Sequence, residues 1–406
     1  MGRRLLLLLS QNPLDPSGGA ARSLDSIGRL LARGGYQIEA IGTTATEFPD
    51  PQVSANTTQM LQGMGINPIQ EVDKGAKVIR FERERVRYTL LDTGSVRLDR
   101  PHVVHGPRFD RIYRGILARL RPEIVLTFGA MPVERERHRQ ARRRGAVVVL
   151  SIHQHTYYDR RAFETADAVH TCSEYLRRCY LERIGVDSTA LSGPLIPEDI
   201  ISPRHDPLFV TFVNPSYEKG VVFVARLAEE LATRRPDIPM LVIESRANAG
   251  TLVAVGDAGG FDLRRHPSLM TAPAVVMPRD IYGPTRLLLA PSVWDEPWGR
   301  VAAEALLNGI PPIVSDRGGL AEACAGAGVV LPLPKDLTIR TRTPPPVAAV
   351  QPWLSEIVRL CDDEAAYATA SSAARQAGER FTPEKVLPQF LDFFDGVRIK
   401  RTVTRS

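Results

Sequence analysis

Residues 287–316 read LLLAPSVWDEPWGRVAAEALLNGIPPIVSD, and the pattern of this segment indicates the fold class. Its apolar run at 287–292 predicts a buried strand, 300–309 predicts a helix that ends at a glycine, and 311–316 predicts the next strand. A strand, a helix and a second strand form the repeating unit of a doubly wound parallel sheet. The segment therefore predicts an α/β fold.

The same alternation extends to both sides of this segment. Further strands are predicted at residues 5–10, 36–43, 77–81, 124–128, 147–153, 168–173, 208–215, 240–245, 274–278 and 327–332. Helices are predicted at residues 18–35, 109–121, 133–145, 220–236, 353–363, 364–381 and 383–397. The proline-rich residues 191–207 interrupt the alternation and mark a linker.

The length of the chain predicts two domains, because 406 residues exceed what one hydrophobic core usually supports. The linker separates a first doubly wound domain, residues 1–195, from a second one, residues 206–375. Ligands of such sheets bind at the carboxyl ends of the strands. Two such domains that face each other share a cleft, which is the default site.

The chain is mildly basic, with a formal net charge of +6. Two runs carry much of the excess, residues 80–87 (RFERERVR) and 135–145 (RERHRQARRRG), and a solvated helix face is the simplest explanation of each. A patch for nucleic acid or for an anionic membrane is the alternative. The longer run holds no Phe, Tyr or Trp on which a base could stack, so we expect no nucleic-acid partner.

The cysteines and the start of the chain suit a cytoplasmic protein. The four cysteines form no CxxC pair and no cluster with zinc spacing, so we expect reduced, structural thiols and no metal site. The start, MGRRLLLLLSQNP, has a short apolar run at residues 5–9 that suits a first buried strand better than a signal peptide. No window approaches the ~20 apolar residues of a membrane span.

Glycines and a lysine stand where two predicted strands give way to helices. Gly18 and Gly19 precede the first helix, where a backbone without side chains lets an anion approach the helix N-terminus. Lys219, in VNPSYEKG, starts a helix of the second domain, where a cation and the helix dipole together suit a phosphate. A tight turn and a solvated lysine are the ordinary alternatives. The glycines do not form GxGxxG, so dinucleotide binding is not indicated.

The opening segment adds two carboxylates, Glu296 and Glu304, eight residues apart. Trp298, Gly299 and Arg300 lie between them and lead into the helix that carries Glu304. A carboxylate accepts two hydrogen bonds at once, which is how proteins hold the hydroxyls of sugars and ribose. A solvated helix face is the alternative for Glu304, but alanines and a leucine surround it.

Two further stretches lie at predicted strand ends. Gly318 and Gly319 precede a helix and suit a second anion-binding turn, although the same stretch also fits an ordinary helix start. His153 ends a strongly β-forming run, and His155 follows two residues later. Functional residues collect at such strand ends, whereas a lone histidine is usually structural.

Together these stretches resemble the retaining glycosyltransferases of family four. The likeness covers nearly the whole chain and is most specific in EPWGRVAAEALLNGIPPIVSDRGGLAE, residues 296–322. The resemblance implies a GT-B fold, with two Rossmann-like doubly wound domains facing a central cleft. Residues 1–195 would form the acceptor side, residues 206–375 would bind a nucleotide sugar, and a C-terminal helix, residues 376–400, would cross back to the N-terminal domain.

The resemblance also implies roles for single residues. Glu296 would bind the hydroxyls of the donor sugar, Glu304 would hold the ribose, and Lys219 would neutralise the diphosphate. Gly19, with Gly18 beside it, would offer its N–H to the β-phosphate, and His153 would contact the sugar near the reaction centre. The amides of the residues after Pro297 would help to hold the sugar: Trp298, Gly299 and Arg300. Such enzymes need no metal or other cofactor, and the chain has no DxD motif at a strand end.

One position departs from the family. The family commonly has an arginine five residues before the lysine, and Asn214 stands there in this chain. An amide donates hydrogen bonds but does not offset the negative charge of a leaving diphosphate. Arg246, Arg300 and Arg317 are the candidates for a replacement, and the sequence does not select among them.

We expect transfer of a sugar from a nucleoside-diphosphate sugar to an acceptor hydroxyl, with retention at the anomeric carbon. A nucleotide-sugar epimerase of the same architecture and a catalytically weak nucleotide-sugar-binding protein are the alternatives. The nucleotide base, the sugar, the acceptor and the oligomeric state are not readable from the sequence. Arginines in loops of the N-terminal domain suit an anionic acceptor or a peripheral membrane contact, and solvated loops explain them equally well.

Overall fold

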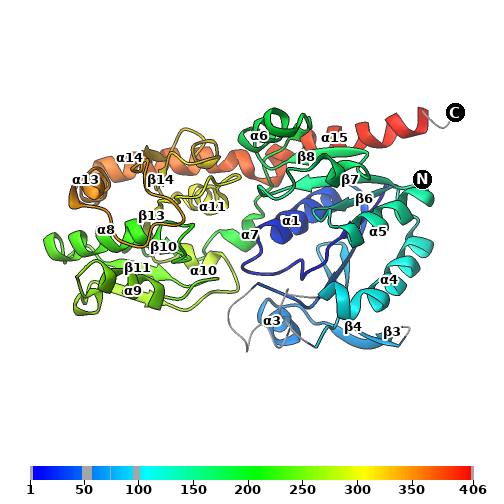
Figure 1. Cartoon of the computed structure of the whole chain (residues 1–406), viewed down its shortest axis with the longest axis horizontal. Coiled ribbons are helices and arrows are strands. Elements are labelled where there is room, and N and C mark those ends of the chain that lie inside the picture. Colours follow the sequence, from blue (N-terminus) through cyan, green and yellow to red (C-terminus); the bar gives the residue numbers. More distant parts are fainter. Residues whose placement is uncertain (1–2, 48–56, 74, 95–100, 404–406) are drawn as a thin grey trace. The chain divides into compact units, whose positions relative to one another are not determined.

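The computed structural model describes residues 3–47, 57–73, 75–94 and 101–403, and the chain divides into two units (Figure 1). The first unit comprises Met1–Pro194 and Pro383–Ser406, and the second comprises Leu195–Thr382. Residues 48–56, 74 and 95–100 of the N-terminal domain lie outside the described residues.

The first unit is built on a nine-stranded sheet with the order β3-β4-β5-β2-β1-β6-β7-β8-β9. In this order, every pair of neighbours from β5 through β2 and β1 to β9 is parallel. β3 and β4 extend the sheet beyond β5 as antiparallel strands. The strand bounds are β1 Arg4–Leu8, β2 Gln37–Thr43, β3 Ile69–Asp73, β4 Ala76–Arg83, β5 Val86–Leu91, β6 Ile124–Thr127, β7 Val147–Ile152, β8 Ala168–Thr171 and β9 Thr189–Ala190.

Helices pack on this sheet through apolar faces. Ile112 and Tyr113 of α4 and Ala141 of α5 join Leu6 and Val125 of the sheet in one buried cluster. The last helix, α15, packs against α1, and the Tyr36 hydroxyl donates to Asp395 at 2.7 Å. The helix bounds are α1 Gly19–Arg33, α3 Thr57–Gly63, α4 Pro101–Leu120, α5 Pro132–Arg143, η1 Arg160–Phe163, α6 Glu174–Ile184 and α15 Pro383–Val403.

The basic run at residues 80–87 is not a helix face, so that interpretation is wrong. It forms a β-hairpin that turns at Glu84 and Arg85, whose φ angles are 46° and 66°. Positive φ at both central residues is typical of the tight turns that join twisted strands. Asn-Gly or Asp-Gly usually announces such a turn in a sequence, and Glu-Arg gives no such signal. The strand predicted at 77–81 is confirmed as β4, while β3 and β5 were not predicted.

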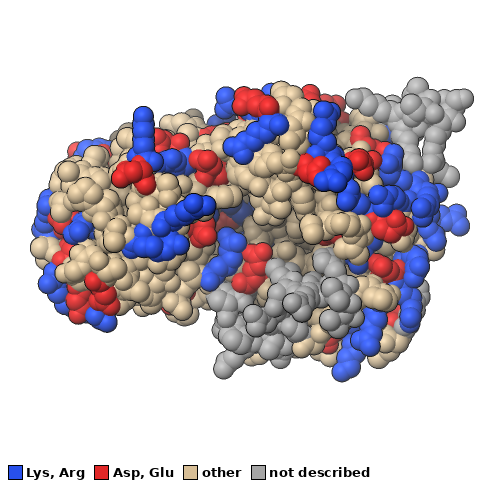
Figure 2. Space-filling view, in the orientation of Figure 1, with Lys and Arg blue, Asp and Glu red and all other residues tan. Residues whose placement is uncertain are grey.

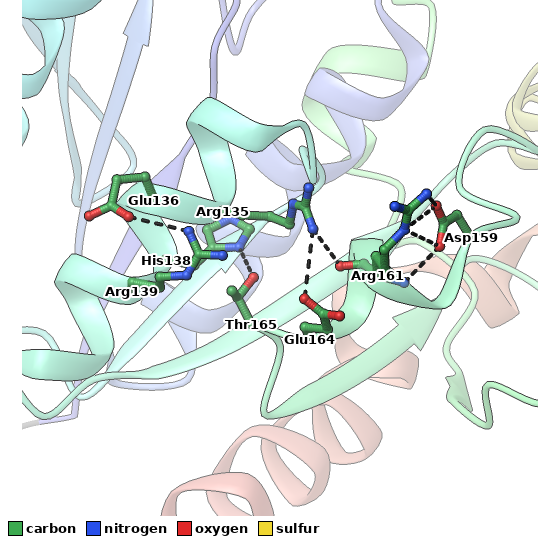
Figure 3. A network of polar contacts seen from close by, with 8 residues as sticks. All are labelled: Arg135, Glu136, His138, Arg139, Asp159, Arg161, Glu164 and Thr165. Carbon is green, nitrogen blue, oxygen red and sulfur yellow. Dashed lines mark hydrogen bonds and ion pairs between the residues drawn. The ribbon is translucent and has the colours of Figure 1, made fainter.

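The second basic run forms the predicted helix, α5, but its inner residues are not solvated. Arg137 is buried against the ring of Phe109 and pairs with Asp110 at 2.7 Å. Figure 3 shows His138 hydrogen-bonded to Thr165, and Arg135 reaching the backbone oxygen of Arg161. The solvated-face interpretation therefore fails for the inner face, because Arg137 anchors α5 to α4 while Arg135 and His138 anchor it to the segment around η1.

Exposed arginines of α5 are interleaved with acidic residues. Arg139 pairs with Glu136, and Arg142 pairs with Asp167 at 3.1 Å. On the face drawn in Figure 2, basic and acidic side chains likewise lie side by side over much of the surface. Ion pairs of this kind are common on ordinary solvated surfaces, so they do not favour a patch for an anionic partner over a solvated surface.

The second unit has a six-stranded parallel sheet with the order β12-β11-β10-β13-β14-β15. The direction of the strand order reverses between β10 and β13, which is the arrangement of a Rossmann-like sheet. The strand bounds are β10 Phe209–Val213, β11 Met240–Ile243, β12 Leu269–Ala272, β13 Thr285–Ala290, β14 Pro312–Ser315 and β15 Val329–Leu331.

The core of the second unit lies between this sheet and its helices, where Phe223 of α8 meets Trp353 of α13 at 5.2 Å between ring centroids. The helix bounds are α7 Pro197–Ile200, α8 Val221–Arg234, α9 Gly250–Ala258, η2 Leu263–Arg265, α10 Arg279–Tyr282, α11 Arg300–Leu307, α12 Leu320–Ala323, α13 Val347–Asp362, α14 Glu364–Gly378 and η3 Glu379–Phe381.

The prediction of a strand at residues 274–278 is wrong, because the strand that pairs with β11 on this side is β12, Leu269–Ala272. β12 is an edge strand with two exposed residues, so a search for apolar runs passes over it. The apolar run that follows is bracketed by Pro273 and Pro278, which cannot donate to a strand ladder.

None of the described helices is both long enough and apolar enough to cross a membrane.

Candidate functional site

The second unit brings three loops together where its strand order reverses. These loops follow β10, β13 and β14, which are neighbours in the sheet. Because the strands are parallel, all three loops lie at the same edge, the edge at which such sheets bind ligands. The loops contain the predicted residues Asn214, Lys219 and Glu296 and lead to Glu304 on α11.

Backbone contacts join these three loops directly. The amides of Val293 and Trp294 donate to the Glu218 carbonyl oxygen at 3.1 and 3.2 Å, and the Gly319 amide donates to the Glu296 carbonyl oxygen at 2.7 Å. A Cβ on Gly220 would lie well inside 3.0 Å of the Pro291 carbonyl oxygen. The glycines therefore permit the loops to touch, and the Gly319 amide, predicted to face an anion, is already engaged.

Lys219 and Glu296 form an ion pair within this cluster. The Lys219 ammonium donates to Oε1 of Glu296 at 2.6 Å, and the Ser292 hydroxyl donates to the same oxygen at 2.6 Å. The Ser315 hydroxyl in turn donates to the Ser292 backbone oxygen at 2.7 Å. Sequence reasoning missed both serines, although each follows or ends a buried strand, which is the signal that could have found them.

Glu304 is buried, with 3% of its surface exposed, and each of its carboxylate oxygens has a donor. The Arg300 Nε donates to Oε1 at 2.6 Å, and the Tyr282 hydroxyl donates to Oε2 at 2.7 Å. Sequence reasoning placed Glu304 correctly away from a solvated face but missed Tyr282, which lies 22 positions earlier in the chain.

Two other predicted donor-binding residues have different surroundings. The Trp298 ring is buried and packs edge-on against Phe381 at 5.3 Å between centroids, so it packs within its own unit. Gly299 has φ +125° and is the residue before α11, and a Cβ there would approach Leu320. No side chain caps α11, and its first turn has no acidic residue.

Asn214 is held in the loop after β10 by its own backbone and side chain. Its φ is +64°, a left-handed conformation that Asn adopts more readily than most residues. Its Oδ1 accepts from the Ala247 amide at 3.1 Å. Among the arginines considered as replacements, Arg300 is paired to Glu304, and Arg317 donates to the Pro334 carbonyl oxygen at 3.1 Å.

The first unit places Gly19 and His153 at the corresponding edge of its own sheet. Gly18 precedes α1, and Gly19 is exposed with no atom within 4 Å of the position of a Cβ. A small pocket beside the start of α1 is lined by Ala20, Phe128, Ile152, His153, Gln154 and Tyr157. His153 therefore lines a recess next to the two glycines.

The two histidines after β7 have different partners. His153 Nε2 lies 2.6 Å from the Ser151 hydroxyl, and its ring meets the buried ring of His170 edge-on. His155 Nδ1 lies 2.5 Å from the Tyr158 hydroxyl. Burial lowers the pKa of His170 to about 4, so the ring packed against His153 is neutral.

A buried carboxylate shapes the loop after β1. Asp15 accepts from the amides of Ser17 and Glu47 at 2.9 and 2.7 Å. Burial raises its pKa to about 6, and these two amides oppose the rise. Among the described residues, no group of three or more His, Cys, Asp or Glu side chains could hold a metal ion.

Comparisons with known proteins bear on the fold. No protein-family model matches the chain, and no curated protein matches its sequence. Sucrose-phosphate synthase from Thermosynechococcus elongatus matches with a TM-score of 0.67 at 16% identity, over 97% of this chain and 99% of that one. A glycosyltransferase from Rickettsia africae matches with a TM-score of 0.63 at 13% identity, over 98% and 99%.

Anabaena HepE, in complex with UDP-glucose, matches with a TM-score of 0.65 at 15% identity, over 97% of this chain and 99% of that one. At such low sequence identities, the structural similarity shows a shared fold and no more. The predicted fold class is confirmed: the protein has the α/β fold of the GT-B glycosyltransferases, with two Rossmann-like domains.

Proposed function

We propose that the protein is a glycosyltransferase that moves a sugar from a nucleoside-diphosphate sugar to an acceptor hydroxyl, with retention at the anomeric carbon. One observation carries the proposal. Lys219 and Glu296, from two different loops, meet at 2.6 Å where the strand order reverses, next to the uncapped start of α11. A cation, a carboxylate and free helix amides together suit a ligand that has both phosphates and hydroxyls.

Each part of the donor has a partner in this proposal. Glu304 accepts hydrogen bonds from the ribose hydroxyls, and Glu296 accepts them from the sugar. Lys219 and the first amides of α11 face the diphosphate, because the ammonium carries a positive charge and the amides carry partial positive charges. On donor binding, the Lys219 ammonium exchanges part of its contact with Glu296 for the phosphate oxygens.

The chemical step breaks the bond between the anomeric carbon and the diphosphate oxygen and forms a bond to the acceptor oxygen on the same face. The acceptor proton moves to the leaving phosphate oxygen. Negative charge grows on the diphosphate as the bond breaks, and Lys219 stabilises it there. His153 and the Gly19 amide, both in the first unit, are assigned to the sugar and the β-phosphate by the resemblance to family four. No metal or other cofactor is needed in this scheme.

The solved relatives do not select the nucleotide. HepE was solved with UDP-glucose, whereas starch synthase IV from Arabidopsis thaliana was solved with ADP and acarbose. We therefore propose a nucleoside-diphosphate sugar as the donor class and leave the base to experiment.

A panel of nucleoside-diphosphate sugars, screened by the shift in melting temperature, tests the proposal. We expect at least one donor to raise the melting temperature and to release its nucleoside diphosphate only when an acceptor is present. Absence of a shift with every donor would contradict the proposal. Interconversion of the donor sugar without an acceptor would identify an epimerase instead.

A second candidate, a nucleotide-sugar-binding protein with weak catalysis, is favoured by Asn214. Its side chain is uncharged and engaged by the Ala247 amide, so it supplies no cation to the diphosphate. Donor binding without release of nucleoside diphosphate, over a broad acceptor panel, would support this candidate.

A further inference from the structure

Two side chains hold the carboxylate of Glu304. Tyr282 has no exposed surface and ends the short helix α10, and its hydroxyl donates to Oε2 at 2.7 Å. Arg300 lies one helical turn before Glu304 on α11 and donates through Nε to Oε1 at 2.6 Å. The carboxylate is therefore fixed at both of its oxygens.

The two donors explain how a charged carboxylate remains inside the domain. Burial of an ionised carboxylate is costly unless other groups pair with it and donate hydrogen bonds to it. The guanidinium supplies the countercharge, and the tyrosine supplies the second hydrogen bond. A carboxylate has about four acceptor positions, so two of them remain for a ligand with neighbouring hydroxyls.

Arg300 has a further donor to offer at the same place. Its Nη1 atom is buried and has no hydrogen-bond partner among the described residues, although Nε is engaged by Glu304. A buried donor without a partner is costly, so a ligand acceptor at Nη1 would be stabilising. Acceptors remain on the carboxylate while a donor remains on the guanidinium, and a ribose hydroxyl can both donate and accept.

We propose that Tyr282 and Arg300 select ribonucleotide donors by holding Glu304 in the orientation that receives the two ribose hydroxyls. Tyr282 is a positioning residue that acts through Glu304, whereas Arg300 both positions Glu304 and donates to the nucleoside through Nη1. This inference rests on the proposed function, because it assigns the nucleoside half of the donor to this site.

The test compares Tyr282→Phe with Tyr367→Phe. Tyr367 is also buried in the second unit, but within the described part of the chain its hydroxyl has no hydrogen-bond partner, so it controls for the loss of a hydroxyl from the core. With the nucleoside diphosphate that the wild type binds, calorimetry should give a dissociation constant about tenfold higher for Tyr282→Phe. The value for Tyr367→Phe should equal that of the wild type. In turnover, the loss from Tyr282→Phe should appear in the donor KM rather than in kcat.

The 2′,3′-dideoxy nucleoside diphosphate separates positioning from a general structural role. We expect the wild type to bind it about tenfold more weakly than the ribonucleotide, and Tyr282→Phe to bind it no more weakly than the wild type does. Equal losses with both nucleotides would overturn the inference, as would an unchanged affinity of folded Tyr282→Phe for the ribonucleotide.

Arg300→Met provides a second variant if Tyr282→Phe fails to fold, because Arg300 is partly exposed and Met keeps the apolar stem. Its affinity for the ribonucleotide should fall by at least tenfold. It should also lose the preference for the ribonucleotide over the dideoxy compound. A retained preference would overturn the inference while leaving the proposed function intact. A wild-type protein that binds no nucleoside diphosphate would defeat the proposed function, and this inference with it.

Discussion

The two units hold buried carboxylates with different partners at the carboxyl ends of their strands. In the first unit, Asp15 accepts from backbone amides, and Glu134 accepts from the Met131 amide at 2.9 Å and the Ser10 hydroxyl at 2.6 Å. In the second unit, Glu296 and Glu304 are held mainly by a lysine, an arginine and hydroxyl side chains.

The difference shows what each loop cluster is built to do. Carboxylates satisfied by amides fix the shape of a loop and leave little for a ligand. Carboxylates paired with cations keep both charges together in one cluster, where a ligand with phosphates and hydroxyls can exchange with them. The parallel strands of the two sheets follow the same order around β1 and β10, yet they support a shaping cluster in one unit and a charged cluster in the other.

The largest expected effect tests the charged cluster. Lys219→Ala should lower kcat about 10²–10³-fold, because the growing charge on the leaving diphosphate loses its cation. Steady-state kinetics with the preferred donor measures this loss. The control is Lys335→Ala, which removes an exposed lysine from the same unit. Equal kinetics of both variants would contradict the role of Lys219.

The contact between the loops of the second unit is tested by Gly220→Ala. We expect it to lower the free energy of unfolding by about 3 kcal/mol, since a Cβ collides with the Pro291 carbonyl and φ is +87°. Gly260→Ala, at φ +79° with no atom nearby, should lower it by only about 1 kcal/mol. All three tryptophans lie in this unit, so their fluorescence in urea reports on its unfolding.

The two glycine variants share the cost of a positive φ and differ in the collision. Equal losses of stability would therefore show that the backbone of the loop after β10 can move away from Pro291, and that the loops are not held at contact distance.

The shaping cluster of the first unit is tested by pH. The folded pKa of Asp15 is about 6 and its ordinary value is 3.8, so between these values the folded state binds more protons than the unfolded state. The contribution of Asp15 to stability therefore falls as pH rises through this window, by about 3 kcal/mol in total. Between pH 4 and pH 7, the free energy of unfolding of Asp15→Asn should therefore rise by about 2–3 kcal/mol relative to that of the wild type.

Urea unfolding followed by circular dichroism at several pH values measures this gain. The transition must be the one that tryptophan fluorescence does not follow, because the first unit has no tryptophan. A difference between Asp15→Asn and the wild type that stays constant with pH would contradict the raised pKa.

The smallest expected effect concerns Ser292, which donates to Glu296. Ser292→Ala should lower kcat/KM about tenfold, corresponding to about 1.4 kcal/mol for one hydrogen bond to a charged group. Ser355→Ala, an exposed serine of the same unit, should leave kcat/KM unchanged. If the two serine variants behave alike, Glu296 does not depend on Ser292 for its position.

Local patterns predicted most of the elements that are buried and regular, although the buried strand β5 was missed. The apolar run at 287–292 and the helix at 300–309 correspond to β13 and α11 within two residues at each end. The edge strands β3 and β12 escaped prediction, because strands that face solvent lack the apolar run that marks a buried one. The hairpin turn at Glu84 and Arg85 escaped because its residues are unusual for the turn.

The alternation of strands and helices could be predicted from the sequence, because hydrophobic periodicity and glycine positions are local properties. The sequence also indicated Lys219, Glu296 and Glu304 as candidate site residues. The groups that hold them became known from the folded structure alone. Tyr282 reaches Glu304 and Lys219 reaches Glu296 across 22 and 77 positions of the chain. Such contacts depend on the order of strands in the sheet, and no local pattern encodes that order.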